Sequence, residues 1–185
     1  FIGRDAGQSS TGGKNTFVGF KAGEDVLNGE YNTYLGKSAG QSAKGGYNVI
    51  VGEYSGANVK GDYNTTLGVN SGRSIEGDRN LILGAEAARN ARGNYNVFIG
   101  NEAGYFANSD NKIYIENTYA DSTEALIYGE FDTNKLRVNG DLGIGTNANH
   151  SIHIVDNSPA LKLALGSNLG ATTRASADFW QTRLS

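Results

Sequence analysis

Apolar and polar positions recur along residues 1–104 with a period of about sixteen residues. Each unit opens with Asn, continues with three mostly β-branched, aliphatic or aromatic residues, and then reaches Gly. The clearest copies begin at Asn15, Asn32, Asn48, Asn64, Asn80 and Asn96, after a truncated copy that begins at Phe1. A fixed period of this size is typical of a solenoid, whose units bury apolar surface only against their neighbours. The pattern therefore predicts an all-β fold in which each coil has two short strands and two tight corners.

Glycine occupies the position where each predicted strand ends. These corner residues are Gly3, Gly19, Gly36, Gly52, Gly68, Gly84 and Gly100, spaced by sixteen residues except for one spacing of seventeen. Glycine adopts positive φ at no steric cost, and Asn tolerates it better than most residues. We therefore expect both residue types to serve as corners.

The three residues after each Asn alternate between two faces, because side chains along a strand point to opposite sides. We expect the third residue to face inward as the coil core, which comprises Val18, Leu35, Val51, Leu67, Leu83 and Ile99. By the same alternation the first residue of each strand should also face inward. The Thr column of Thr16, Thr33 and Thr65, interrupted by Val49, Leu81 and Val97, is therefore expected inside the coil.

The middle residue of each strand then faces outward. This column is Phe17, Tyr34, Ile50, Thr66, Ile82 and Phe98. An apolar stripe of several aromatic and aliphatic side chains exceeds what soluble monomers usually expose. We therefore predict that this column forms a trimer interface, with the coils of three identical chains packed around an axis.

The unit Asn-x-x-aliphatic-Gly-x-x-Ala/Ser-Gly resembles the head repeat of trimeric autotransporter adhesins and of related phage tail-fibre proteins. The resemblance covers seven copies, with modest departures: Ala88 replaces Gly in one copy, Arg79 replaces Tyr in another, and one copy is a residue longer. It implies a left-handed parallel β-roll assembled as an intertwined or side-by-side homotrimer. A smaller β-rich trimeric module is expected to follow.

The sixteen-residue repeat ends near residue 108, and alternating apolar and polar segments separated by loops follow. We expect strands at 111–116, 126–131 and 135–138, with Asn139-Gly140 as a hairpin signal. Residues 125–146 resemble the stretch that links a repetitive shaft to later modules in fibres of phages and phage-like contractile injection systems. The predicted domains are a β-roll over 1–110, a strand connector over 111–146 and a C-terminal β-rich segment over 147–185.

Composition narrows the functional classes. The chain has no Cys, a formal charge of −3 and no basic cluster, so neither thiolate chemistry nor a nucleic-acid footprint is expected. No apolar run reaches the about 20 residues of a membrane span. His150 and His153 lack partners for a metal site, and Gly12-Gly13-Lys14 and the glycines of 140–145 lack the context of a phosphate loop. We expect no catalytic residue, cofactor or metal.

The leading functional hypothesis is a non-enzymatic trimeric fibre that attaches a phage tail or injection system to a target cell surface. Its expected partners are two further copies of itself, baseplate or tail proteins bound through an upstream region, and a surface receptor, which could be a glycan. It would then belong to an extracellular particle. The head of a cell-anchored trimeric adhesin, a glycan-cleaving tailspike and an ice- or lattice-binding solenoid are the alternatives.

A column of tyrosines has two interpretations, as a sugar-binding site or as a structural stack of rings. Tyr31, Tyr47, Tyr63 and Tyr95 precede the Asn of four units. They could form a ladder that binds sugars, but we favour stacking of the rings on one another along one corner.

Overall fold

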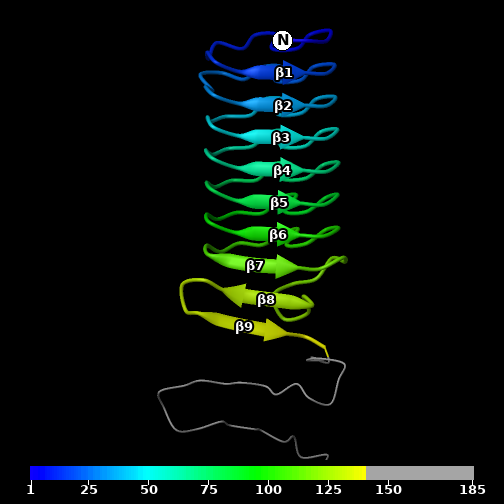
Figure 1. Cartoon of the computed structure of the whole chain (residues 1–185), viewed down its shortest axis with the longest axis vertical. Coiled ribbons are helices and arrows are strands. Elements are labelled where there is room, and N and C mark those ends of the chain that lie inside the picture. The colour runs from blue at the N-terminus through cyan, green and yellow to red at the C-terminus, as the bar shows by residue number, and fades with distance from the viewer. Residues whose placement is uncertain (141–185) are drawn as a thin grey trace, which may run out of the picture. The chain divides into compact units, whose positions relative to one another are not determined.

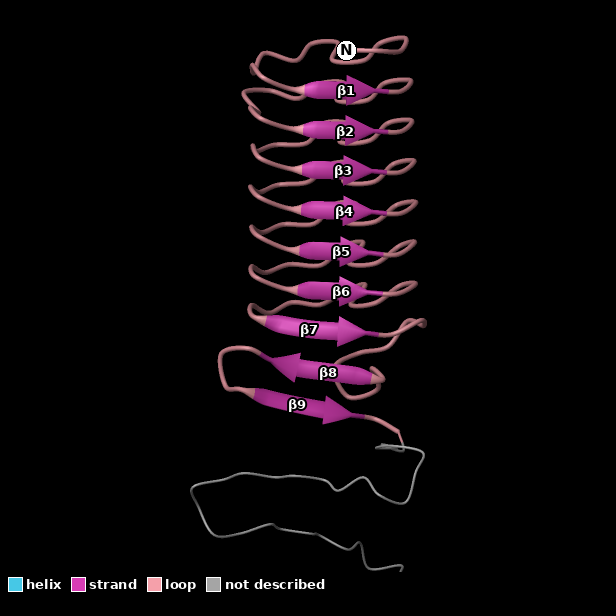
Figure 2. Cartoon of the chain, in the orientation of Figure 1, coloured by secondary structure: helices cyan, strands magenta, loops and turns pink. Residues whose placement is uncertain are grey.

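The computed structural model describes residues 1–140. These residues form a stack of coils whose strands pair into a single nine-stranded sheet (Figure 1). Its first six strands have three residues each: β1 (Thr16–Val18), β2 (Thr33–Leu35), β3 (Val49–Val51), β4 (Thr65–Leu67), β5 (Leu81–Leu83) and β6 (Val97–Ile99). They are followed by β7 (Lys112–Ile115), β8 (Ile127–Glu130) and β9 (Lys135–Val138). The fold is a β-solenoid of about six turns with coils of about sixteen residues. The described residues contain no helix (Figure 2).

Strands β1 to β7 pair in parallel, and each residue faces its equivalent in the next coil. Phe17 pairs with Tyr34, and Tyr34 in turn pairs with Ile50. The opposite wall contributes isolated parallel bridges, such as that between Lys44 and Lys60. Because every coil hydrogen-bonds the next along its whole length, the repeat of the sequence becomes a repeat in space.

The solenoid ends where β8 runs antiparallel to β7 and β9 runs antiparallel to β8. The strands predicted at 111–116, 126–131 and 135–138 are present as β7, β8 and β9, and the described part of the 111–146 connector continues the sheet. The predicted segment 147–185 lies outside the described residues, as does the continuation of the chain after Gly140. The handedness and the trimeric assembly remain predictions.

The interior of each coil is filled by the middle residue of the strand. Phe17, Tyr34, Ile50, Thr66, Ile82 and Phe98 are all completely buried within their own chain. Small side chains from the other walls complete the core, among them Ala22, Val26, Ala39 and Ala43. The prediction that the middle residues form a trimer interface is therefore wrong.

The assignment of the coil core is wrong for the same reason. Val18, Leu35, Val51, Leu67, Leu83 and Ile99 are half-buried or exposed, and Leu67 has half of its surface exposed. The alternation along the strand was correct, but its phase was inverted. A coil this narrow has room for one large side chain per strand, so the central ring faces inward and both flanking residues face outward.

The asparagines do not serve as the positive-φ residues of the corner. That conformation belongs to the preceding residue, with φ between 56° and 59° at Tyr31, Tyr47, Tyr63, Arg79 and Tyr95. Each Asn instead forms part of a buried ladder: its Oδ1 accepts the backbone N–H of the next Asn, as from Asn64 to Asn48 at 2.8 Å. In the asparagines from Asn15 to Asn80, Nδ2 donates to a glycine carbonyl thirteen or fourteen residues ahead, as from Asn64 to Gly77 at 2.9 Å, whereas the Nδ2 of Asn96 has no partner among the described residues. The ladder satisfies backbone groups that the sheet leaves unpaired at this corner.

The one longer coil carries its extra residue at an exposed corner. Two residues, Leu27 and Asn28, lie between Val26 and Gly29, whereas one residue lies between the equivalent Val59 and Gly61. Asn28 adopts φ 61°, and its backbone N–H donates to Thr11 Oγ1 at 3.0 Å. The next strand remains in register, so the insertion is absorbed locally.

Candidate functional site

The outer face of strands β1 to β7 is a regular surface that continues in register along the stack. Its two columns hold the first and third residues of the three-residue strands: Thr16, Thr33, Val49, Thr65, Leu81 and Val97, and Val18, Leu35, Val51, Leu67, Leu83 and Ile99. Ile113 and Ile115 of β7 continue them in register. No position in either column is charged. A flat, uncharged and mostly apolar surface is the composition expected of an interface core rather than of a solvated wall.

The dimensions of this face follow from sheet geometry. Seven strands about 4.8 Å apart span about 29 Å, and the two columns are about 7 Å apart along the strand. The footprint is on the order of 200 Å², which is less than the about 800 Å² that each partner contributes to a standard interface. The face can therefore bring copies together, but these strands alone should associate reversibly.

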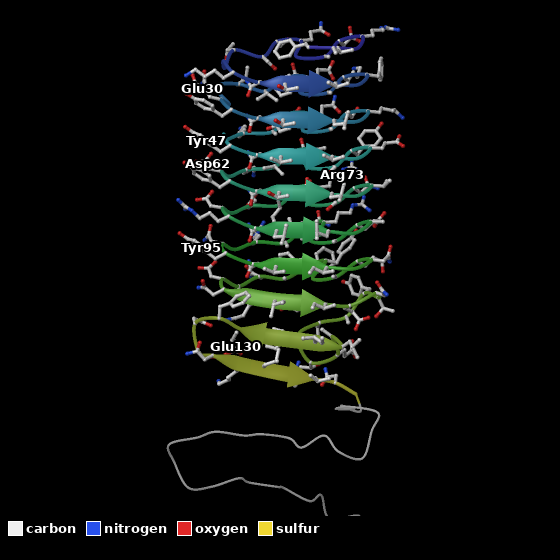
Figure 3. All side chains as sticks on the ribbon, in the orientation of Figure 1. Glu30, Tyr47, Asp62, Arg73, Tyr95 and Glu130 are labelled. Atoms are coloured by element: carbon white, nitrogen blue, oxygen red, sulfur yellow. The ribbon has the colours of Figure 1, made fainter. Side chains whose placement is uncertain are left out.

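The tyrosine column lies along a different edge of the stack. Figure 3 shows Tyr47 and Tyr95 on one edge and Arg73 on the opposite one. Tyr31, Tyr47 and Tyr63 stack in parallel, with ring centroids 4.8 and 4.7 Å apart. The guanidinium of Arg79 lies 4.9 Å from the Tyr63 ring and 5.4 Å from the Tyr95 ring, in the place of the missing aromatic residue.

This ladder covers the ring faces that a sugar would need. A ring inside a parallel stack has both faces occupied, and Lys14 lies 4.4 Å from the Tyr31 ring at the end of the stack. The faces of Tyr31, Tyr47 and Tyr63 are thus covered by neighbouring rings and cations, which favours stacking over sugar binding for the column. Arg79 preserves the stack because a cation over an aromatic face is itself attractive.

The glycines predicted at corners lie directly after the strands. Gly19, Gly36, Gly52, Gly68, Gly84 and Gly100 have φ between 118° and 138°. A Cβ on Gly52 would lie 2.3 Å from the carbonyl oxygen of Gly68 in the next coil. These glycines allow the close approach of successive coils.

Chemistry is sparse in the part of the chain that the structure describes. Residues 1–140 hold no group of three or more His, Asp or Glu side chains arranged to bind a metal ion. Among them there is also no helix long and apolar enough to cross a membrane. His150 and His153 lie outside the described residues.

Sequence reasoning missed an aromatic cluster at the end of the solenoid. Tyr105 and Phe106 close the last coil, and Tyr119 comes from the loop between β7 and β8. The signal was present in the sequence, because no earlier coil has aromatic residues at the positions of Tyr105 and Phe106.

Comparison of the chain with family models, curated proteins and solved structures gives no match.

Proposed function

We propose that this chain is a segment of a non-enzymatic, homotrimeric fibre that attaches an extracellular particle, a phage tail or a phage-like contractile injection system, to a target cell surface. The observation that carries the proposal is the uncharged outer face of β1 to β7, which is regular along the whole stack. The likeness of the repeat to the head repeats of trimeric adhesins and tail fibres supports the same assignment.

The corrected face suits a threefold arrangement better than the column first predicted. Around a threefold axis parallel to the stack, equivalent rungs of the three chains lie at the same height. The column that contains Thr33 and Val49 on one chain would then pack against the column that contains Leu35 and Val51 on the next. Such head-to-tail pairing closes after three copies and leaves no free apolar column.

The fibre would act through rigidity and multivalency. Continuous hydrogen bonding between coils makes each chain a stiff spacer, and three parallel chains present three copies of any binding site together. Weak single contacts then combine into strong attachment through effective concentration.

The face admits one rival function. The Thr column faces outward, whereas the sequence predicted it inside the coil. An ice- or lattice-binding solenoid requires such an outward array of threonines. However, only Thr16, Thr33 and Thr65 of its six positions in β1 to β6 are threonine, and Leu35 and Leu67 project beside them. Irregular side-chain size disfavours lattice matching and favours packing against another protein chain.

The test is the mass of the full chain in solution across a dilution series, measured by sedimentation. We expect a concentration-dependent species of three chains of 19.5 kDa each. Leu67→Glu, in the middle of the face, should shift the equilibrium to monomer, because each interface would then bury a carboxylate against the uncharged column of the next chain. Val69→Glu is the matched control, since Val69 is equally exposed but lies after the corner glycine.

A wild-type chain that remains monomeric at all concentrations would contradict the trimer. Equal effects of Leu67→Glu and Val69→Glu would instead contradict the assignment of the interface to the strand face. Circular dichroism of both variants establishes that the fold is retained.

A further inference from the structure

The last coil departs from the repeat at one corner. In each coil, a Gly or Ala lies four positions after the corner glycine that ends the strand, and the two residues after it differ from coil to coil. In the first six coils these pairs are Gln8-Ser9, Glu24-Asp25, Gln41-Ser42, Ala57-Asn58, Arg73-Ser74 and Arg89-Asn90. In the last coil they are Tyr105-Phe106. Two aromatic residues thus replace mostly polar residues at a position where six preceding coils have none.

Tyr105 is half-buried, but Phe106 and its neighbour Tyr119 remain exposed, although apolar side chains of this size are usually buried. Phe106 has 61% of its surface exposed, and Tyr119, which lies against it, has 57%. The three ring centroids lie close together: 4.8 Å for Tyr105 and Phe106, 5.4 Å for Tyr105 and Tyr119, and 5.8 Å for Phe106 and Tyr119.

The ring geometry differs from that of the tyrosine ladder in a way that matters for binding. The Tyr105–Phe106 and Phe106–Tyr119 pairs are edge-to-face, with interplanar angles of 82° and 88°, and the Tyr105–Tyr119 pair is tilted by 55°. Parallel stacking covers a face of both rings, whereas an edge-to-face pair covers a face of only one. The cluster therefore leaves aromatic surface available that the ladder does not.

The cluster borders a pocket of about 300 Å³. Polar residues share its wall, including Asn108 and Asp121. This volume is at the lower end of the range of about 300–1,000 Å³ found for small-molecule sites. The pocket therefore suits one or two sugar rings rather than a larger ligand.

Asp121 is held in place by its own turn. Its Oδ1 accepts hydrogen bonds from the backbone N–H and the hydroxyl of Thr123, both at 2.6 Å. These bonds lower the pKa of Asp121, so the carboxylate is ionised at neutral pH. Both bonds engage Oδ1, and a carboxylate oxygen can accept more than one hydrogen bond, so Asp121 retains capacity to accept from ligand hydroxyl groups.

We propose that the pocket formed by Tyr105, Phe106, Tyr119 and Asp121 binds a neutral hexopyranose unit of a surface glycan. The apolar C–H face of the sugar packs on the electron-rich face of an aromatic ring. Sugar hydroxyls donate to the Asp121 carboxylate, and the same negative charge disfavours acidic sugars. This inference rests on the proposed attachment function and gives it a location.

The site lies away from the proposed trimer interface. Tyr105 occupies the coil position of Arg73, which Figure 3 shows on the edge of the stack beyond the strand ends. The guanidinium of Arg89, one coil earlier at the same position, lies 5.8 Å from the Tyr105 ring. Assembly through the strand face would thus leave three pockets open, one for each chain.

The test is a titration of the full chain with methyl glycosides of glucose, galactose and N-acetylglucosamine, followed by NMR, with sialic acid as the acidic probe. We expect at least one neutral glycoside to bind with a dissociation constant of about 1 mM, in keeping with weak single-site contacts. Sialic acid should bind more weakly.

Two variants probe the pocket, and one serves as the control. Tyr119→Ala and Phe106→Ser, which restores a residue typical of the earlier coils, should each weaken binding at least tenfold. Tyr47→Ala, which removes a ring from the ladder, should change the affinity less than twofold.

Unchanged affinity in both pocket variants, or no binding of any neutral glycoside up to about tenfold above the expected constant, would overturn the proposal. A large loss of thermal stability in Phe106→Ser without any sugar binding by the wild type would assign the cluster to capping the solenoid instead. Sedimentation of the same samples separates the two proposals: a trimer without sugar binding contradicts only the pocket, and a monomer that binds sugar contradicts only the fibre.

Discussion

The hydroxyl oxygens of Ser55 and Thr66 lie 2.7 Å apart inside the solenoid, and both residues are completely buried. Apart from the phenol of Tyr34, Thr66 carries the only polar group in the buried column that runs from Phe17 to Phe98. Its partner Ser55 occupies a position that is Ala in the coils of Ala22 and Ala39. The two polar substitutions therefore compensate each other, because a lone hydroxyl in this interior would lack a strong partner.

Thr66→Val should lower the free energy of unfolding by about 1 kcal/mol, because Ser55 would keep only a long 3.3 Å bond to the Ser71 carbonyl. Adding Ser55→Ala should cost less than the sum of the single changes. Urea titration at one fixed protein concentration measures this coupling. Strict additivity would show that the hydroxyl pair contributes nothing.

Tyr34→Phe should stabilise the protein. The Tyr34 hydroxyl is buried and makes no hydrogen bond of normal geometry in the described part of the chain, although the Asn48 side chain lies close enough to act on its pKa. Removing it relieves a desolvation cost of about 1 kcal/mol and leaves the ring stacked on Phe17, 4.8 Å away. The melting temperature measures the gain, and Tyr47→Phe on the exposed ladder is the control that should show none. A lower melting temperature for Tyr34→Phe would point to an internal partner for the hydroxyl.

Stability should fall at alkaline pH through the buried tyrosines. Burial is the main cause that raises the pKa of Tyr114 from 10.0 to about 12, and it also raises the pKa of Tyr34. Because the unfolded chain ionises first, this contribution is complete below pH 10 and is lost as the pH rises towards 12. Unfolding free energies measured across this interval should decline less in Tyr114→Phe than in the wild type. Parallel curves would contradict the assignment to Tyr114.

Gly52→Ala should cost more than about 2 kcal/mol, because it combines an unfavourable backbone conformation with a steric clash. Gly52 has φ 133°, and the new methyl group would lie 2.3 Å from the Gly68 carbonyl oxygen. Gly13→Ala should be nearly neutral, since an added Cβ meets no atom within 4 Å. Chemical denaturation of both variants compares a glycine that the stack requires with one that it does not. Similar losses would mean that coil spacing adjusts more readily than the geometry implies.

The period, one strand per coil and the tight corners could be predicted because the sequence repeats them at a fixed spacing. The predicted second strand of each coil is present only as an isolated bridge, such as that between Lys44 and Lys60. Strands β7 to β9 could be predicted from alternation between turn signals. The direction in which Phe17 and Val18 point could not be derived from the strand alone, because alternation fixes relative sides and not which side is inside. The small residues Ala22 and Ala39 on the opposite wall held that information, since they leave space for one large ring.

The candidate site was harder to predict from the sequence than the fold. The outer face was expected in the wrong column, so its trimer-forming role had to be reassigned to residues such as Leu35 and Leu67. The pocket depends on Tyr119, which meets Tyr105 only because β8 reverses direction after β7. A contact created by a loop has no signature in a periodic pattern. What the sequence could have shown was the break itself, where Tyr105 and Phe106 replace the residues of six earlier coils.

The added residue at Leu27–Asn28 shows where this architecture tolerates extra length. The strands on either side keep their pairing, with Thr16 opposite Thr33, and Thr11 hydrogen-bonds the displaced backbone. The same corner in other coils, between Val59 and Gly61 for instance, is thus a natural graft point for epitopes or ligand-binding peptides. Grafts in successive coils would be displayed about 4.8 Å apart, the distance between neighbouring strands, so the choice of coils would set the spacing between the displayed peptides.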